Sequence, residues 1–218
     1  PATHVVEVRR TWQLSGVDDH PSIEPVFLAI VNTPQGWRVV DDDPLRRLGL
    51  TSTRSLWEVS DIEILRDAGR VLVGAPQDVG RMREVAGLLD TAEQRLPGLV
   101  PPAAYLVVVP SGASQAKEFM QTPLDVSKFV AFVSFSIDRT AAWQAGPPRL
   151  VLQEGNLRRR STARQVFILA HELAHLSTLA DAGPLTPLWV HEGYADWEAN
   201  GRPPGRSGIL EIPEAHSF

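Results

Sequence analysis

The chain contains no cysteine at all. This absence excludes disulfide bonds, cysteine-ligated zinc sites and thiol nucleophiles together. No apolar run approaches the roughly 18 residues that a membrane-spanning helix needs, and no stretch has the layout of a signal peptide. Basic residues number 21 against 26 acidic ones, and the resulting net charge of -5 argues against nucleic-acid binding. The densest basic stretch, residues 157–160, is predicted to be an exposed turn.

The composition that remains is ordinary for a globular protein. The 218 residues are 43% apolar and 22% charged, enough for one large domain, or for one domain with a smaller appendage. A packed core therefore needs no disulfides. The chain begins at Pro1 rather than methionine and ends shortly after a stretch rich in proline and glycine. We therefore expect a fragment of a longer protein, with any targeting or anchoring segment outside it.

The first 50 residues carry β-strand patterns. Residues 4–14 alternate apolar and polar side chains, which is typical of a half-buried strand. Residues 26–32 and 36–40 are two further short apolar runs, and the turn-forming residues between them predict a hairpin. Three aspartates and a proline at 41–44 end this pattern. Residues 1–50 are thus predicted to form a small β-rich segment.

The middle of the chain alternates strand and helix patterns. Apolar residues at helical spacing predict a helix over 78–96, which ends at a Pro-Gly pair. One or two helical turns are expected within 114–121. The other segments are predicted to be strands: 55–65, 70–74, 105–109, 129–137 and 149–153. The prediction is an α+β fold with a mixed β-sheet.

Two helices are predicted at the C-terminal end. The first begins near Thr162, which has the spacing of a capping box with Gln165, and continues to about residue 180. Apolar residues surround nearly its whole circumference, so it should be central and buried. The second is expected from Pro187 to about residue 199, with the Asn-Gly pair after it as a C-terminal cap.

The first of these helices contains the sequence His-Glu-Leu-Ala-His at 171–175. Positions four apart share one helix face, so His171 and His175 can hold one zinc ion from the same side. Glu172 lies beside that face, where it can act as general base toward a water molecule. Two hydrogen-bonded core histidines are the alternative. A metal is favoured, because two imidazoles and a carboxylate in an apolar helix are costly to bury without a cation.

A catalytic zinc site needs a third protein ligand and one open position. The second helix offers His191 and Glu192, and adjacent helical residues diverge by about 100°. Glu192 is favoured over His191, because Asp196 follows it one turn later on the same face. A carboxylate there can accept the second ring N–H of a metal-bound histidine, expected to be His171, and thereby fix its tautomer.

These motifs resemble those of the gluzincin metallopeptidases, which include thermolysin and the zinc aminopeptidases. The chain looks closest to the bacterial peptidase MA-like members, and the resemblance covers His171 to Trp197, in which sixteen residues separate His175 from Glu192. It implies that Glu192 is the third zinc ligand and that Asp196 contacts a metal ligand without binding the metal itself. The matching Gly193 and Ala195 imply close packing of the two helices.

The first 50 residues are similar, more weakly, to the last strands of NTF2-like cystatin-fold domains. A structural flap on the peptidase is the alternative. The predicted division is a β-rich segment at 1–50, a possible NTF2-like remnant, followed by a gluzincin-like domain at 51–218 that is truncated at its C-terminus. The resemblance leaves the cellular location open, with the cell envelope or exterior of a bacterium favoured.

Two features of the family have no clear match. The Gly-x-Met-Glu-Asn loop of the zinc aminopeptidases is absent from the sequence, which favours endopeptidase over aminopeptidase action. The family also uses a tyrosine or histidine to stabilise the oxyanion. The only tyrosines are Tyr105 and Tyr194, and Tyr194 stands where the family has a packing aromatic residue. The oxyanion donor is therefore expected beyond Phe218.

The predicted function is zinc-dependent hydrolysis of peptide bonds in a peptide or protein substrate. His171, His175 and Glu192 would bind Zn²⁺, Glu172 would act as general base, and Asp196 would orient a histidine. The alternative from another functional class is a catalytically incomplete zinc-binding module that binds a partner. Glu172 argues against that alternative, because a purely structural site needs no base and leaves no open position. A metal-free helical core is a third alternative.

Overall fold

The computed structural model describes residues 2–40, 43–50, 55–99, 104–112, 115–116, 126–138, 144–178 and 186–202. Within these ranges helices combine with mixed sheets, so the predicted α+β class is confirmed. One sheet has five strands, and two smaller antiparallel sheets have three and two. No helix in the described part of the chain is long and apolar enough to cross a bilayer.

The five-stranded sheet is the centre of the fold. Its strand order is β4-β5-β6-β10-β7, with the three inner strands parallel and the two edge strands antiparallel to their neighbours. The inner strands are buried along their whole length, which explains why their sequences are apolar runs rather than alternating patterns. The strands are β4 (Glu63–Asp67), β5 (Arg70–Gly74), β6 (Tyr105–Val109), β7 (Ala131–Ser134) and β10 (Arg149–Leu152).

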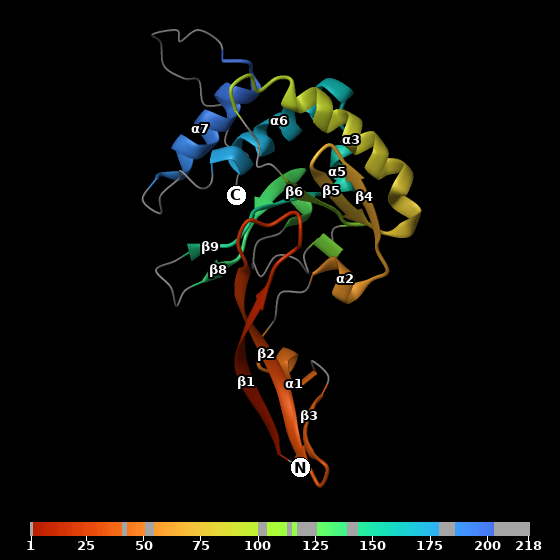
Figure 1. The fold of residues 1–218 in the computed structure, drawn as a ribbon, viewed down its shortest axis with the longest axis vertical. Coiled ribbons are helices and arrows are strands. Elements are labelled where there is room, and N and C mark those ends of the chain that lie inside the picture. Colours follow the sequence, from red (N-terminus) through yellow and green to blue (C-terminus); the bar gives the residue numbers. More distant parts are fainter. Residues whose placement is uncertain are drawn as a thin grey trace.

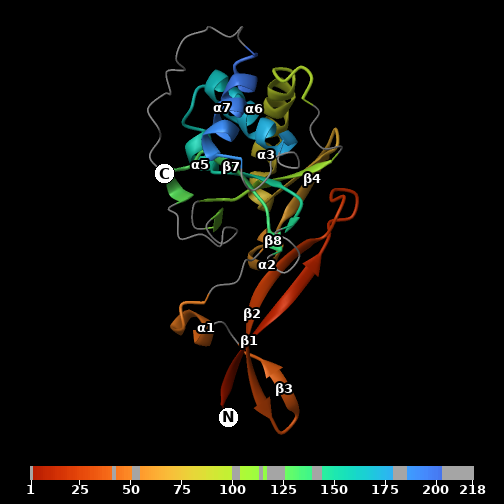
Figure 2. The same cartoon turned by 90° about the vertical axis from the view of Figure 1, so that its left-hand side faces the viewer.

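Each face of this sheet packs against its own apolar cluster. On one face, α3 (Val79–Glu93) and α6 (Thr162–Thr178) cover the larger cluster, and α7 (Leu188–Ala199) lies outside α6 (Figures 1 and 2). On the other face, the smaller cluster is closed by Leu56 of α2 (Leu56–Val59) together with Leu14 and Val17. The helix α6 therefore lies between the sheet and α7, as its apolar circumference predicts.

The N-terminal strands form a ribbon that extends away from the rest of the protein (Figures 1 and 2). It consists of β1 (Thr3–Trp12), β2 (Ser22–Thr33) and β3 (Gly36–Val39) in antiparallel order, so the predicted hairpin is confirmed. Gly36 has a φ of 102°, a conformation that favours glycine at this turn. Short elements complete the chain: α1 (Asp43–Arg47), η1 (Pro76–Asp78), η2 (Val126–Lys128), β8 (Ile137–Asp138), β9 (Gln144–Ala145) and α5 (Glu154–Leu157).

The turn between β1 and β2 joins the ribbon to the five-stranded sheet. The carboxylate of Asp18 is fully buried and accepts hydrogen bonds from both terminal nitrogens of Arg149, at 2.5 and 2.7 Å. The ring of Trp12 lies 5.3 Å from the Arg149 guanidinium carbon. A buried ion pair of this kind fixes orientation, because either partner alone would be a buried unpaired charge.

Two predicted strands differ from the observed elements. Residues 55–65 contain a helix, α2, before β4, because Ser55 and Glu58 form a capping box in which the Ser55 N–H donates to Glu58 Oε2 at 2.6 Å. The predicted strand 129–137 is divided into the four residues of β7 and the start of β8. Of the helical turns expected at 114–121, only residues 115–116 lie within the described ranges.

The helix ends also refine the predictions. The capping box assigned to Thr162 is wrong, because the oxygen of Ser161 accepts the first-turn N–H of Arg164 at 3.4 Å. The amide of Gln165 instead donates to the Arg160 carbonyl at 2.9 Å. Pro187 is the N-cap of α7 rather than its first residue. The predicted cap after α7 is confirmed, with Asn200 as C-cap and the following glycine at a φ of 74°.

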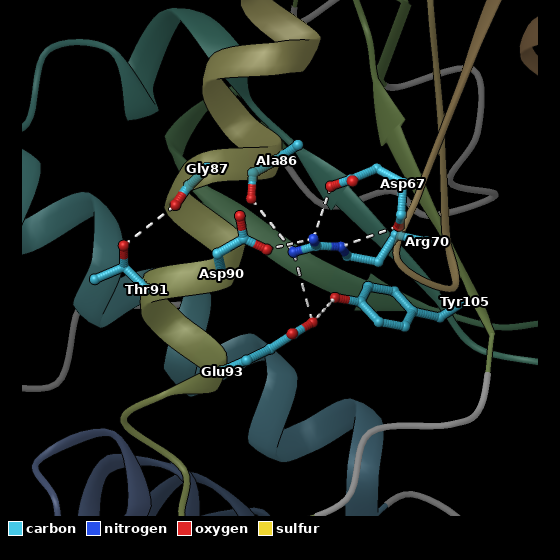
Figure 3. Close-up of polar contacts among 8 residues, drawn as sticks. All are labelled: Asp67, Arg70, Ala86, Gly87, Asp90, Thr91, Glu93 and Tyr105. Carbon is cyan, nitrogen blue, oxygen red and sulfur yellow. Dashed lines mark hydrogen bonds and ion pairs between the residues drawn. The ribbon is translucent and has the colours of Figure 1, made fainter.

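A buried arginine connects the first two strands of the large sheet to α3 (Figure 3). The Arg70 side chain is 1% exposed, and it forms ion pairs with Asp67 at 2.7 Å, with Asp90, and with Glu93 at 3.7 Å. The Tyr105 hydroxyl donates to Glu93 at 2.6 Å. Burial and this hydrogen bond raise the pKa of Tyr105 above its ordinary value. The network is thus expected to be sensitive to alkaline pH.

We expect Tyr105→Phe to lower the free energy of unfolding by about 1–2 kcal/mol near neutral pH, because Glu93 loses a hydrogen bond. Above about pH 10 the unfolded tyrosine ionises while the folded one keeps its proton. The free energy of unfolding of the wild-type protein should therefore fall with rising pH, and the difference in this free energy between the wild-type protein and the variant should become smaller. Urea unfolding across this pH range tests the prediction, and a difference that widens would contradict it.

Candidate metal centre

Two helices bring three potential metal ligands to one point. His171 and His175 lie one turn apart on α6, and Glu192 faces them from α7. The two Nε2 atoms are 3.0 Å apart, and the carboxylate oxygens of Glu192 lie 3.3 Å from His171 Nε2 and 3.5 Å from His175 Nε2. In the part of the chain that the structure describes, this is the group of acidic and histidine side chains that can hold a metal ion.

The spacing of the three ligand atoms suits zinc. Ligands bonded at about 2.0–2.1 Å to one tetrahedral zinc ion lie roughly 3.3 Å from each other. The two Nε2 atoms are 3.0 Å apart, and each lies near its own carboxylate oxygen of Glu192, His171 Nε2 at 3.3 Å from Oε2 and His175 Nε2 at 3.5 Å from Oε1, so every separation is close to this value. Two imidazoles with one carboxylate are also a donor set that zinc accepts at catalytic sites. The residues present therefore fit a zinc ion with an open fourth position.

Asp196 lies behind His171. Its Oδ1 atom is 2.9 Å from His171 Nδ1, on the side of the ring opposite to the ligand atom. The carboxylate thus accepts the Nδ1 proton, so that Nε2 is the nitrogen left to ligate a metal ion at the shared point, the arrangement expected from the spacing of Glu192 and Asp196. The side chain of His171 is 16% exposed and that of His175 is 18% exposed, so solvent reaches both rings.

The charges around His171 favour a cation. Burial alone lowers the pKa of His171, but hydrogen bonds with Asp196 and Glu192 outweigh it and raise this pKa to about 10. The same hydrogen bonds from both histidines hold the pKa of Glu192 far below its ordinary value. In the metal-free protein a proton therefore occupies the position where a metal ion would be ligated.

Glu172 lies on the side of α6 that faces the sheet. Burial raises the pKa of its carboxyl group, while the two nearby histidines and a backbone hydrogen bond from Val133 of β7 lower it in part. The net direction is upward, as expected for a carboxylate that acts as a general base near neutral pH. The contact with Val133 also places this carboxyl group beside an edge strand of the sheet.

The two helices run antiparallel, because Glu192 contacts both histidines and Asp196, one turn later, contacts only the earlier one. Ala195 and Ala199 of α7 are each 1% exposed, and small side chains there let the helices approach closely. The prediction that the two helices pack closely at Gly193 is wrong. A side chain added there would meet no atom within 4 Å, because positions two apart on a helix face nearly opposite directions.

The other candidates from the sequence lie outside the ligand group. His191 is half-buried and is not among the residues that converge on the metal position. The hydroxyl of Tyr105 donates to Glu93 in the arginine network, which occupies it away from the metal position. Tyr194 is exposed, and the neighbouring carboxylate of Glu198 raises its pKa.

Two contacts of the site were not identified from the sequence. The Val133 backbone contact to Glu172 depends on strand pairing, which has no local signal. The ring of Phe167 lies 6.5 Å from that of His171, between the histidine and Arg164, whose guanidinium carbon is 4.5 Å from the Phe167 ring centre. Their spacing of three and four residues on one helix is a signal that was available.

No family model, curated protein or solved structure that we compared matches this chain. The chemistry of the site therefore rests on its own residues.

We expect Asp196→Asn to weaken zinc binding about 10- to 100-fold, because the neutral amide accepts the His171 Nδ1 hydrogen bond less strongly than the negatively charged carboxylate does. Asp61→Asn, at an exposed position in the loop before β4, is the matched control and should bind zinc like the wild-type protein. Competition with a fluorescent zinc chelator gives both affinities. Equal affinities for the two variants would contradict the assigned role of Asp196.

Zinc binding should release about one proton near neutral pH. His171, with its pKa of about 10, is protonated without metal, and a ring nitrogen must lose its proton to bind the ion. The apparent affinity should accordingly fall roughly tenfold for each unit of pH lowered below that pKa. Calorimetry in two buffers of different ionisation enthalpy counts the protons, and a count of zero would contradict this account.

Proposed function

We propose that this protein is a zinc-dependent peptidase that hydrolyses peptide bonds with Glu172 as general base. The observation that carries the proposal is the convergence of three ligand atoms beside a buried carboxyl group. The sequence resemblance to gluzincin metallopeptidases supports the same conclusion. Endopeptidase action is favoured, because the loop by which the zinc aminopeptidases bind a substrate amino terminus has no counterpart in the sequence.

His171, His175 and Glu192 would hold the metal, with Asp196 fixing the tautomer of His171. When bound, zinc acts as a Lewis acid that lowers the pKa of a water molecule to about 7 and polarises the scissile carbonyl. In the metal-free protein the neighbouring histidines hold the pKa of Glu192 far below its ordinary value, so its carboxylate is already ionised and can ligate a cation. The chain supplies the charge balance and orientation that this chemistry requires.

Glu172 has the position and the proton affinity of the base. It accepts a proton from the attacking water and delivers it to the leaving amine, a role that contributes typically 10²- to 10⁴-fold to a rate. Its raised pKa makes it a stronger base than an exposed glutamate. The hydrogen bond from Val133 holds the carboxylate in place between the helix and the strand.

The edge strand β7 supports binding of an extended peptide. Val133 lies on β7, which pairs with β10 along one edge and has no strand partner along its other edge among the residues that the structure describes. A peptide that added to this edge as a further strand would lie beside the base and the metal ligands. Backbone pairing of this kind binds substrates with little regard to side-chain identity.

Glu172→Gln should reduce peptide hydrolysis by about 10²- to 10⁴-fold while zinc content stays at one ion per chain, because the amide cannot accept the proton. Glu63→Gln, on the exposed edge strand β4, is the matched control and should keep full activity. The assay is mass spectrometry of a peptide library after incubation with the zinc-loaded proteins.

Equal hydrolysis by the wild-type protein and the Glu172→Gln variant would show that Glu172 is not the general base. Zinc binding without any hydrolysis by the wild-type protein would favour the alternative, a catalytically incomplete zinc module that binds a partner. Failure of the wild-type protein to bind zinc would reject both.

A further inference from the structure

The face of α6 that carries the metal ligands continues toward the N-terminus of the helix. Arg164, Phe167, His171 and His175 follow one another at spacings of three or four residues, so they lie along one side of the helix. Ring contacts connect them, with 4.5 Å from the Arg164 guanidinium carbon to the Phe167 ring, 6.5 Å from that ring to His171, and 4.6 Å between the two histidine rings. The guanidinium cation of Arg164 therefore lies at one end of this row, and the metal position lies at the other end.

The charge of Arg164 is not balanced by the protein around it. The side chain is exposed, and no acidic residue among those that the structure describes forms an ion pair with it. The first turn of α6 contains no acidic residue, although the positive end of a helix dipole favours one. This end of the row would therefore gain from a negatively charged group.

Arg164 is nevertheless held rather than freely mobile. Its guanidinium group lies over the face of Phe167, an arrangement that is attractive and that limits the rotamers of a long side chain. A guanidinium stacked on an aromatic ring still presents its N–H groups at its rim. Those groups match the two oxygens of a carboxylate.

We propose that Arg164 is a specificity-determining residue that binds a carboxylate of the peptide substrate; this inference rests on the proposed function. Arg164 lies seven positions before His171, a distance of about 10.5 Å along a helix at about 1.5 Å per residue. An extended peptide covers about 3.3 Å per residue. The recognised carboxylate thus lies two to four residues from the bond that is cleaved.

Two sources can supply this carboxylate. One is the side chain of an aspartate or glutamate within a longer peptide, and the other is the C-terminal carboxylate of the peptide itself. Both present the same planar group with two oxygens, and the arrangement at Arg164 accepts either. The first source makes the protein an endopeptidase with an acidic preference, whereas the second confines cleavage to a fixed distance from the C-terminus.

The first experiment compares cleavage sites in one peptide library, digested by the zinc-loaded wild-type protein and by the Arg164→Gln and Arg159→Gln variants. Half of the library is amidated at its C-termini, which separates the two sources. We expect enrichment of acidic residues, or of free C-termini, two to four residues from the cleaved bond. Arg164→Gln should reduce this enrichment roughly three- to tenfold. Arg159→Gln, the same change at an exposed arginine before the helix, should leave it unchanged.

The second experiment requires no hydrolysis. The same library is passed over immobilised Glu172→Gln protein, with and without the additional Arg164→Gln substitution, and the retained peptides are identified. Retention of carboxylate-bearing peptides that depends on Arg164 supports the inference, even if the wild-type protein cleaves nothing and the proposed function alone fails. The inference is overturned if Arg164→Gln changes neither the cleavage profile nor the retained peptides more than Arg159→Gln does.

Discussion

The antiparallel contact between α6 and α7 is the constraint on which the rest of the structure depends. Neither helix tolerates its charged side chains alone, because two imidazoles on one helix and two carboxylates on the other are partly removed from water. Placed face to face, the groups compensate one another. The small side chains of Ala195 and Ala199 set the close approach that this requires. The site is therefore a consequence of helix packing rather than of a flexible loop.

The large sheet positions this helix pair. Residues of its buried inner strands and of α3 form the larger apolar cluster, in which the apolar side chains of α6 are also packed. The edge strand β7 contributes Val133, whose backbone orients Glu172. Elsewhere, buried arginines connect the parts. Arg70 joins the first strands to α3 (Figure 3), and Arg149 joins the sheet to the N-terminal ribbon. The side chains of the candidate metal centre are thus supported by packing and ion pairs of the protein itself.

Local patterns were sufficient to predict the long helices α3, α6 and α7 and most strands, but not the short helices α1, α2 and α5. They also predicted that His171, His175 and Glu192 converge, because residues four apart on a helix share a face and the next helix carries the carboxylate. Strand ends and caps were less predictable, because Ser55 and Ser161 compete with neighbouring residues for the same role. The contact of Val133 with Glu172 follows from the pairing of distant segments, which no local pattern encodes. Gly193 shows the limit of transferring a motif, since its position in the family did not reveal which way it faces.

The most direct test of this account is a crystal structure of the zinc-loaded protein, with anomalous diffraction measured at the zinc absorption edge. We expect one strong anomalous peak within bonding distance, about 2.0–2.2 Å, of His171 Nε2, His175 Nε2 and a Glu192 carboxylate oxygen. A peak bound by other residues, or the absence of any peak between the two helices, would contradict it.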